Sequence, residues 1–114
     1  MPSTLHEPAS GLRNVANNEN LYRKLLGKFA AQQANAATEI EQALQAGDME
    51  LAQRLVHTLK GLSASMGLPG LTETSLAMET AFKTGDDTTA LLTQLREDLQ
   101  ASLRAVAEYL GSAG

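Results

Sequence analysis

Apolar residues recur along most of the chain at spacings of three and four residues, the period of an α-helix with one buried face. No segment shows the alternation of apolar and polar residues that is typical of a half-buried β-strand. Turn-forming residues separate the periodic segments and set their limits. The pattern predicts a short helix over 8–15 and longer helices over 19–46, 49–66, 71–84 and 88–110.

The predicted helix limits carry residues that start or stop a helix. Pro8 suits a first helical turn, where its missing N–H has no partner to lose. Gly47 can adopt the left-handed conformation that closes a helix, and Asp48 can cap the helix that follows. We expect residues 1–7 to form a flexible lead-in and residues 111–114 to form a frayed tail.

Four long helices joined by connections of only a few residues must run antiparallel to their neighbours. The sequence therefore predicts an all-α fold, an antiparallel up-down-up-down four-helix bundle with a short additional N-terminal helix, over residues 8–110. Aromatic residues make up only 4% and Trp is absent, so Leu, Ala and Met must build the core. Packing should be thin in the middle of the helix over 19–46, where Gln32, Gln33 and Asn35 interrupt the apolar face.

The charge and composition exclude several classes of function. The net charge is −4 and the nine Lys and Arg residues are scattered, whereas a nucleic-acid binder needs a basic stripe. Without cysteine there is no disulfide, thiol nucleophile or Cys-based zinc site. No apolar run approaches the roughly 20 residues of a membrane span, and residues 1–7 lack the apolar core of a signal peptide. We therefore expect a cytoplasmic protein, or a cytoplasmic piece of a larger one such as a membrane sensor kinase, that itself contacts neither nucleic acid nor membrane. We also expect a monomer.

Most enzyme signatures are absent. The chain has no Gly-rich loop ending in Gly-Lys-Ser/Thr, and therefore no visible cradle for ATP. Ser63 and Ser65 lie outside any Gly-x-Ser-x-Gly sequence, and their helical spacing suits packing. The two histidines, His6 and His57, lack the spacing of paired metal ligands. We expect no metal and no cofactor on this chain. Its close carboxylates are more simply solvated surfaces or caps: Glu39 with Glu41, and Asp86 with Asp87.

The helix predicted over 49–66 has one apolar side and one polar side. At about 100° per residue, His57 falls on the polar side, so it should be exposed rather than part of the core. The predicted buried side consists of Leu51, Ala52, Leu55, Leu59, Leu62 and Met66. The opposite side collects Glu50, Gln53, His57, Lys60, Gly61 and Ala64.

His57 is the candidate for chemistry on this polar side. A neutral imidazole is a good nucleophile, and histidine is largely neutral at cytoplasmic pH. Lys60 is close enough along the helix to meet an oxygen of a phosphoryl group on His57. Gly61 lies one turn after His57, where its missing side chain lets a partner approach, at a helix cost of about 1 kcal/mol relative to Ala. Ala64 is also small, so no large side chain covers this part of the helix surface. Together these residues indicate a phosphoryl-accepting histidine.

Each of these residues also has a purely structural explanation. An exposed histidine on a helix is usually a polar surface residue, and Lys60 by itself would be a solvated charge. Gly61 could be a helix-packing contact and Ala64 simply a good helix former. Their grouping on one face favours the phosphoryl acceptor, but the helical pattern alone leaves both explanations open.

The residues around His57 resemble a known family. His57-Thr58-Leu59-Lys60-Gly61, followed by Gly67, is similar to the signature of histidine-containing phosphotransfer (HPt) domains of bacterial two-component phosphorelays. The resemblance extends over about residues 8–110. The surrounding segments that carry it are Gly11-Leu12-Arg13, Leu21 to Leu26 with Phe29, Ala43 to Asp48, and Met78 to Ala81 followed by Gly85.

The resemblance implies a bundle whose exposed His57 accepts a phosphoryl group from a receiver-domain phosphoaspartate and passes it to another receiver. It implies Lys60 as the electrostatic partner of that group, with Gly61 and Gly67 as small residues that allow access. The chain would be a phosphohistidine carrier without ATP-dependent kinase activity of its own, and Mg²⁺ would belong to the receiver's acidic site. The expected partners are receiver domains of a hybrid sensor kinase, of a response regulator, or of both.

An alternative function is a helical docking or scaffold module that carries no phosphate. An exposed His57 beside Lys60 favours the carrier, whereas a His57 packed in the core favours the scaffold. A free-standing carrier and a domain of a larger sensor kinase both fit the sequence. A receiver docked over His57 would bury apolar residues at the edge of this face. The candidates are Leu12, Val15 and Leu68, with Arg13 and Arg54 at the rim.

Overall fold

A computed structural model describes residues 5–111, and these residues form helices and no strand. Residues 1–4 of the predicted lead-in and residues 112–114 of the predicted tail lie outside the described residues. None of the described helices is both long and apolar enough to cross a membrane. The helices are α1 (Pro8–Arg13), α2 (Glu19–Gln33), α3 (Ala36–Gln45), α4 (Met49–Met66), α5 (Pro69–Thr84) and α6 (Thr89–Gly111).

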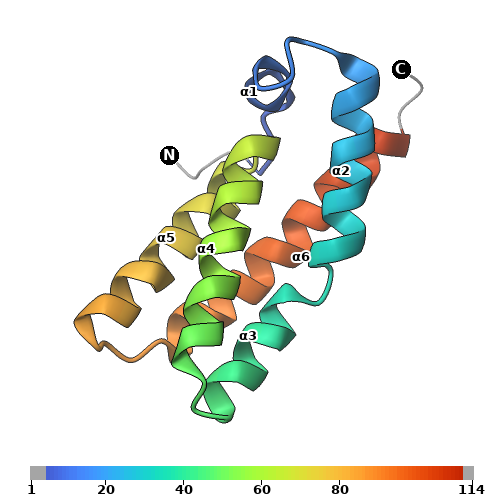
Figure 1. The fold of residues 1–114 in the computed structure, drawn as a ribbon. Helices are drawn as coiled ribbons and strands as arrows, with labels where there is room; N and C mark the ends of the chain where they lie inside the picture. Colours follow the sequence, from blue (N-terminus) through green and yellow to red (C-terminus); the bar gives the residue numbers. More distant parts are fainter. Residues whose placement is uncertain (1–4, 112–114) are drawn as a thin grey trace.

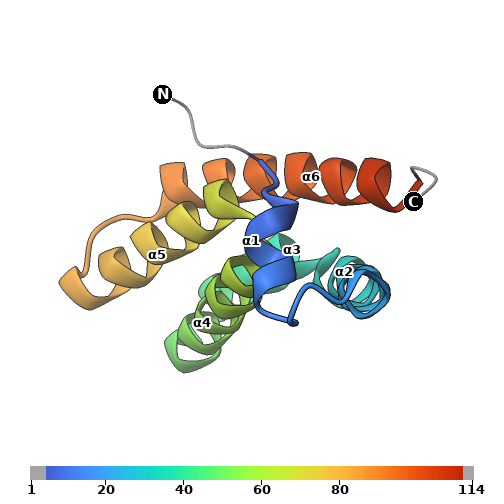
Figure 2. The same cartoon turned by 90° about the horizontal axis from the view of Figure 1, so that it is seen from above.

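The helices form the predicted antiparallel bundle (Figure 1). Helices α2 and α3 follow one another down one side, α4 returns upward, α5 runs down, and α6 runs up to the C-terminus. Helix α4 packs between α3 and α5, while α6 packs against α5 and against the α2–α3 pair. Helix α1 lies across the end of the bundle, where it contacts α4 and α2 (Figure 2). The predicted fold class is confirmed.

The prediction of one continuous helix over 19–46 is wrong. The chain leaves the helix after Gln33 and re-enters it at Ala36, so that two shorter helices take its place. The break falls where polar residues interrupt the apolar face. Asn35 disfavours a helix interior because its side chain competes for backbone hydrogen bonds, and its carbonyl instead accepts the N–H of Glu39 in the first turn of α3.

The turn into α4 has the predicted chemistry. Gly47 adopts a left-handed backbone with φ of 73°. The side chain of Asp48 accepts the backbone N–H of Leu51 at 3.0 Å and caps α4. Helix α5 begins two residues earlier than predicted, at Pro69, because proline is well suited to a first helical turn.

The buried face of α4 is centred differently from the predicted one. Val56 and Ser63, which the leucine pattern did not include, are fully buried. Leu51, Leu55 and Leu62 are only partly buried. Because α4 packs between two helices, its leucines flank the buried line instead of forming it. The buried residues of α4 are Ala52, Val56, Leu59, Ser63 and Met66.

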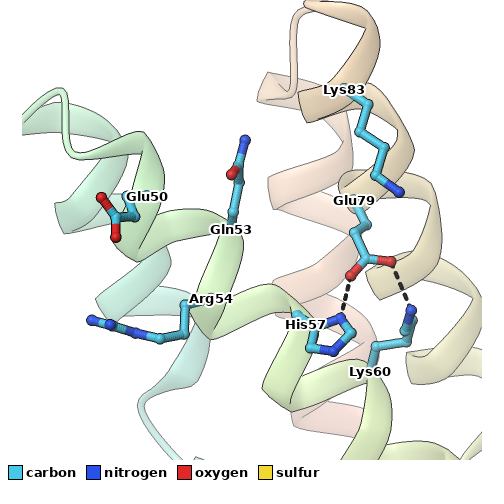
Figure 3. Close-up of a pocket in the computed structure, with 7 residues that line it drawn as sticks. All are labelled: Glu50, Gln53, Arg54, His57, Lys60, Glu79 and Lys83. Carbon is cyan, nitrogen blue, oxygen red and sulfur yellow. Dashed lines mark hydrogen bonds and ion pairs between the residues drawn. The ribbon is translucent and has the colours of Figure 1, made fainter.

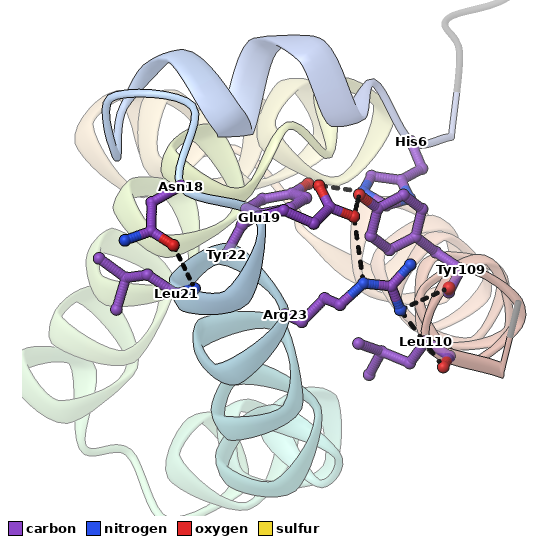
Figure 4. Close-up of polar contacts among 8 residues, drawn as sticks. All are labelled: His6, Asn18, Glu19, Leu21, Tyr22, Arg23, Tyr109 and Leu110. Carbon is purple, nitrogen blue, oxygen red and sulfur yellow. Dashed lines mark hydrogen bonds and ion pairs between the residues drawn. The ribbon is translucent and has the colours of Figure 1, made fainter. Parts of the chain in front are cut away.

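The chain just before α1 is tied to the end of the bundle, although a flexible lead-in was expected up to residue 7. The backbone N–H of Glu7 donates to the carbonyl of Gly67 at 2.6 Å. The Tyr22 hydroxyl donates to the carbonyl of Met66 at 2.6 Å, and His6 Nε2 lies 2.7 Å from the same hydroxyl (Figure 4). Burial raises the pKa of Tyr22 to about 12, so the hydroxyl stays protonated at neutral pH. His6 must therefore be the donor to Tyr22.

A second group of contacts joins the start of α2 to the end of α6 (Figure 4). The guanidinium of Arg23 donates to the carbonyls of Tyr109 and Leu110 and pairs with Glu19. The Tyr109 hydroxyl donates to the same Glu19 carboxylate at 2.7 Å. These contacts satisfy carbonyls at the C-terminus of α6 that have no partner within the helix.

Gly67 closes α4 with a left-handed backbone, φ 77°, directly beneath the carbonyl of Glu7. A side chain there would be strained and would also overlap Glu7. Gly47 has nearly the same φ but open space around the position of a Cβ atom. A side chain at Gly47 would add backbone strain alone, whereas a side chain at Gly67 would add strain and a steric overlap.

We expect Gly67→Ala to lower the free energy of unfolding by about 2–4 kcal/mol, since it adds overlap to strain. The matched control Gly47→Ala should cost only about 1 kcal/mol, from strain alone. Urea unfolding followed by circular dichroism measures both. Equal losses would show that the contact between Gly67 and Glu7 contributes nothing.

Candidate functional site

His57 stands on α4 at the edge of a groove between α4 and α5, and its side chain is 72% exposed (Figure 3). It projects from the polar face that the sequence predicted, next to the buried Val56. The prediction of an exposed histidine is confirmed. The groove is lined by Glu50, Gln53, Arg54, His57 and Lys60 from α4 and by Glu79 and Lys83 from α5.

Glu79 contacts the side chains of both His57 and Lys60 on α4. Its Oε2 lies 2.6 Å from His57 Nδ1, and its Oε1 accepts the ammonium of Lys60 at 2.7 Å (Figure 3). The Glu79 side chain is only 14% exposed, so these contacts replace much of its water. The hydrogen bond from Lys60, followed by the one from His57, lowers the pKa of Glu79. Glu79 is therefore a carboxylate at neutral pH.

This arrangement determines which nitrogen of a neutral His57 carries the proton. A carboxylate can only accept hydrogen bonds, so Nδ1 must be the N–H that donates to Glu79. The lone pair is then on Nε2, which makes no hydrogen bond to any residue within 5–111. A carboxylate that holds one imidazole nitrogen fixes the tautomer and orients the ring. The site thus presents an oriented nucleophile to solvent.

Glu79 was not among the site residues that the sequence pattern predicted. It belongs to the Met78 to Ala81 segment that contributed to the family resemblance, but no role followed from that segment. Glu79 lies 22 residues from His57 in the sequence. Only the packing of α5 against α4 brings the two together, and helical periodicity within one segment contains no signal of it.

Gly61 and Ala64 are exposed and form a surface of small residues on α4, C-terminal to His57. A Cβ atom built on Gly61 would meet no atom within 4 Å, so this glycine is not a packing contact. The space beside His57 is therefore open. Its use for access by a partner stays a prediction.

The structure gives Gly67 a role other than access to His57. It is buried beneath Glu7, and the lining of the His57 groove does not include it. Its left-handed backbone and its contact with Glu7 account for the glycine. The predicted access role is therefore corrected to helix closure and close packing.

The predicted docking residues are only partly placed around His57. Leu68 is fully buried in the core and cannot meet a partner, so that prediction is wrong. Leu12 and Val15 are partly buried against the core. Arg13 is exposed and donates to Ser10 within α1. Arg54 is the docking candidate that lines the His57 groove.

The remaining candidates for chemistry have structural roles. The Ser63 hydroxyl contacts the carbonyl of Lys60 and the hydroxyl of Thr72, and Ser65 donates to the carbonyl of Gly61. Within residues 5–111, no three His, Cys, Asp or Glu residues are grouped so that they could hold a metal ion.

The family model of the Hpt domain matches residues 24–107. The chain belongs to the Hpt domain family. The fold is similar to the crystal structure of the HPT domain from an Hpt sensor hybrid histidine kinase of Shewanella, with a TM-score of 0.85 and 20% sequence identity, over 96% of this chain and 97% of that chain. A search of curated proteins found no match.

Membership of the Hpt family confirms the resemblance identified from the His57 segment. It supports a histidine phosphotransfer role in phosphorelays in general terms. Hpt domains of two-component systems interact with receiver domains, which gives the class of partner.

We expect Glu79→Gln to lower the free energy of unfolding at pH 7, because the variant keeps the size of the side chain but loses the carboxylate that Lys60 and His57 share. The pKa of Glu79 in the folded chain is below its ordinary value of 4.5. The advantage of the wild type should therefore be complete above about pH 4.5 and disappear as the pH falls through the lower folded pKa.

Urea unfolding at pH 7 and at pH 3 measures this difference. Glu50→Gln is the matched control, since Glu50 lines the same groove but makes no ion pair with residues 5–111. At pH 7 the control should change the unfolding free energy less than Glu79→Gln does. A difference between wild type and Glu79→Gln that persists unchanged at pH 3 would contradict the ionic role of Glu79.

Proposed function

We propose that His57 accepts a phosphoryl group on Nε2 from the phosphoaspartate of one receiver domain and passes it to the aspartate of another. The observation that carries the proposal is the 72% exposed imidazole whose Nδ1 is held by Glu79, while Nε2 has no hydrogen-bond partner within residues 5–111. The Nε2 lone pair attacks phosphorus, the bond between phosphorus and the aspartyl oxygen breaks, and a carboxylate leaves. Nδ1 keeps its proton and its bond to Glu79 throughout.

Phosphoryl transfer requires positioning and charge stabilisation more than covalent chemistry from the protein. In our proposal Glu79 is the positioning residue, because it sets the tautomer and the orientation of the ring. The ammonium of Lys60 donates to the other oxygen of the same Glu79 carboxylate, close to the ring. In our proposal this ammonium stabilises the oxygens of the phosphoryl group on His57. The phosphoryl group comes from the partner, because the sequence has no visible cradle for ATP, and we assign any Mg²⁺ to the acidic site of the receiver.

The exposure of His57 supports the carrier rather than the scaffold. A scaffold has no need of an oriented histidine at the surface, and holding one exposed side chain in one orientation costs conformational entropy. The contact with Glu79 and Lys60 is an arrangement that suits a nucleophile. Since receiver domains are the partners, we propose that the chain acts in the cytoplasm.

His57→Gln should abolish labelling by a phosphorylated receiver and leave the helical content unchanged, because His57 is exposed and contributes little to the core. The measurement is acid-labile, base-stable phosphate on the chain, with circular dichroism as the folding check. His6→Gln is the control with the other histidine removed, and it should keep its label. Undiminished acid-labile phosphate on His57→Gln would exclude the proposed function.

Substitutions at Gly61 separate access from folding. Gly61→Ala should stabilise the chain by about 1 kcal/mol, since Ala is the better helix former and its Cβ meets nothing. Gly61→Trp should fold as well, because the side chain enters open space. It should nevertheless slow transfer from the receiver by about tenfold, equivalent to ~1.4 kcal/mol. An unchanged transfer rate in folded Gly61→Trp would show that this surface of small residues plays no part in access.

A further inference from the structure

The His57 groove contains two positive charges that the fold itself does not use. Lys60 is engaged by Glu79, whereas Arg54 and Lys83 make no ion pair or side-chain hydrogen bond with any residue within 5–111. Both are exposed, Arg54 on α4 and Lys83 on α5 (Figure 3). The chain as a whole carries a net charge of −4. Glu50 lines the same groove and makes no ion pair with residues 5–111 either, so the five charged residues of the lining sum to +1. This excess of positive charge on an otherwise acidic protein favours an anionic partner.

Other grooves of the bundle have the opposite character. The groove between α3 and α4 is lined by Glu39 and Asp48 and contains no Lys or Arg. The groove beside α5 and the start of α6 is lined by Glu73, Asp86 and Asp87, again without a cation. An anionic partner is repelled by both. Of the three grooves, the one between α4 and α5 is therefore the one that attracts an anionic partner.

An exposed apolar residue of α5, Leu76, borders the His57 groove from the ridge that it shares with the acidic groove of Glu73, Asp86 and Asp87. Leu76 is 51% exposed, more than the other exposed large apolar residues of the described chain. Leu76, Glu79 and Lys83 are spaced at i, i+3 and i+7, so they share one side of α5. Glu79 touches His57, which places Leu76 and Lys83 on either side of the reactive ring along α5. A partner that covers both His57 and this part of α5 would bury the exposed leucine.

We propose that the receiver docks across the α4–α5 face, with Leu76 as its apolar anchor and with Arg54 and Lys83 paired to the anionic rim of the phosphoaspartate site. This inference rests on the proposed function, because a receiver that brings an acyl phosphate and the carboxylates that bind its metal ion presents negative charge to His57. Arg54 and Lys83 accelerate encounter by electrostatic steering, and Leu76 holds the docked complex by burial.

The test measures the second-order rate of transfer from a receiver domain phosphorylated on its aspartate, at low and at high salt. The pair Arg54→Gln/Lys83→Gln should transfer about tenfold more slowly than wild type at low salt, with a weaker dependence on salt. Leu76→Ser should slow transfer severalfold and keep the wild-type salt dependence. Each variant is also labelled with phosphoramidate, a small donor that reaches Nε2 without docking, and should react as wild type does.

Matched controls lie on the other helices. The pair Lys28→Gln/Arg104→Gln removes the same charge from exposed sites on α2 and α6, and Leu21→Ser removes an exposed leucine from α2. These variants should transfer at the wild-type rate. Equal slowing by the control pair would mean that net charge, and not the α4–α5 face, matters, and would overturn the inference.

Three further outcomes separate this inference from the proposed function. Normal transfer in Arg54→Gln/Lys83→Gln and in Leu76→Ser, with no transfer in His57→Gln, would overturn the docking surface and leave the phosphoryl acceptor intact. Slowing by Gln42→Trp, in the α3–α4 groove, with normal rates in the α4–α5 variants, would place the receiver on that other groove and overturn the inference as well. Full labelling of His57→Gln would overturn the proposed function itself.

Discussion

One carboxylate, that of Glu79, organises the reactive surface of this Hpt domain. Its two oxygens bind Nδ1 of His57 and the ammonium of Lys60, so one side chain of α5 fixes two side chains of α4. The contact requires α4 and α5 to keep their register, which the shared core maintains through buried residues such as Leu59 and Met78. The orientation of the His57 ring is therefore a property of the helix pair and not only of the helix that carries the histidine.

The charged residues around this contact fall into two groups, those paired within the fold and those left unpaired. Glu79 holds the ring and pairs with Lys60, whereas Glu50, Arg54 and Lys83 make no ion pair within residues 5–111. Two other grooves of the bundle are lined by carboxylates without a cation. An acidic chain can in this way attract an anionic partner to one face, because field strength near a surface depends on the local charges more than on the net charge.

Two glycines near the end of α4 show how one residue type serves two different physical needs. Gly61 lies in the exposed helix, where a side chain would meet nothing. Gly67 closes the same helix with a left-handed backbone under Glu7, where a side chain does not fit. The contact at Gly67, with Tyr22 bonded to Met66 and His6, joins the start of the chain to α4 and α2. It stabilises the end of the bundle without lining the His57 groove.

The sequence by itself determined the helices, their antiparallel order and the exposure of His57, because period and turn chemistry are local properties of a chain. It predicted one helix where Asn35 divides two, and it placed Gly67 and Leu68 near the partner although both are buried. The burial of Gly67 and Leu68 depends on which helices and loops pack against them in the folded chain. The tertiary structure alone decided the role of Glu79, since contacts between residues far apart in sequence arise only when helices pack.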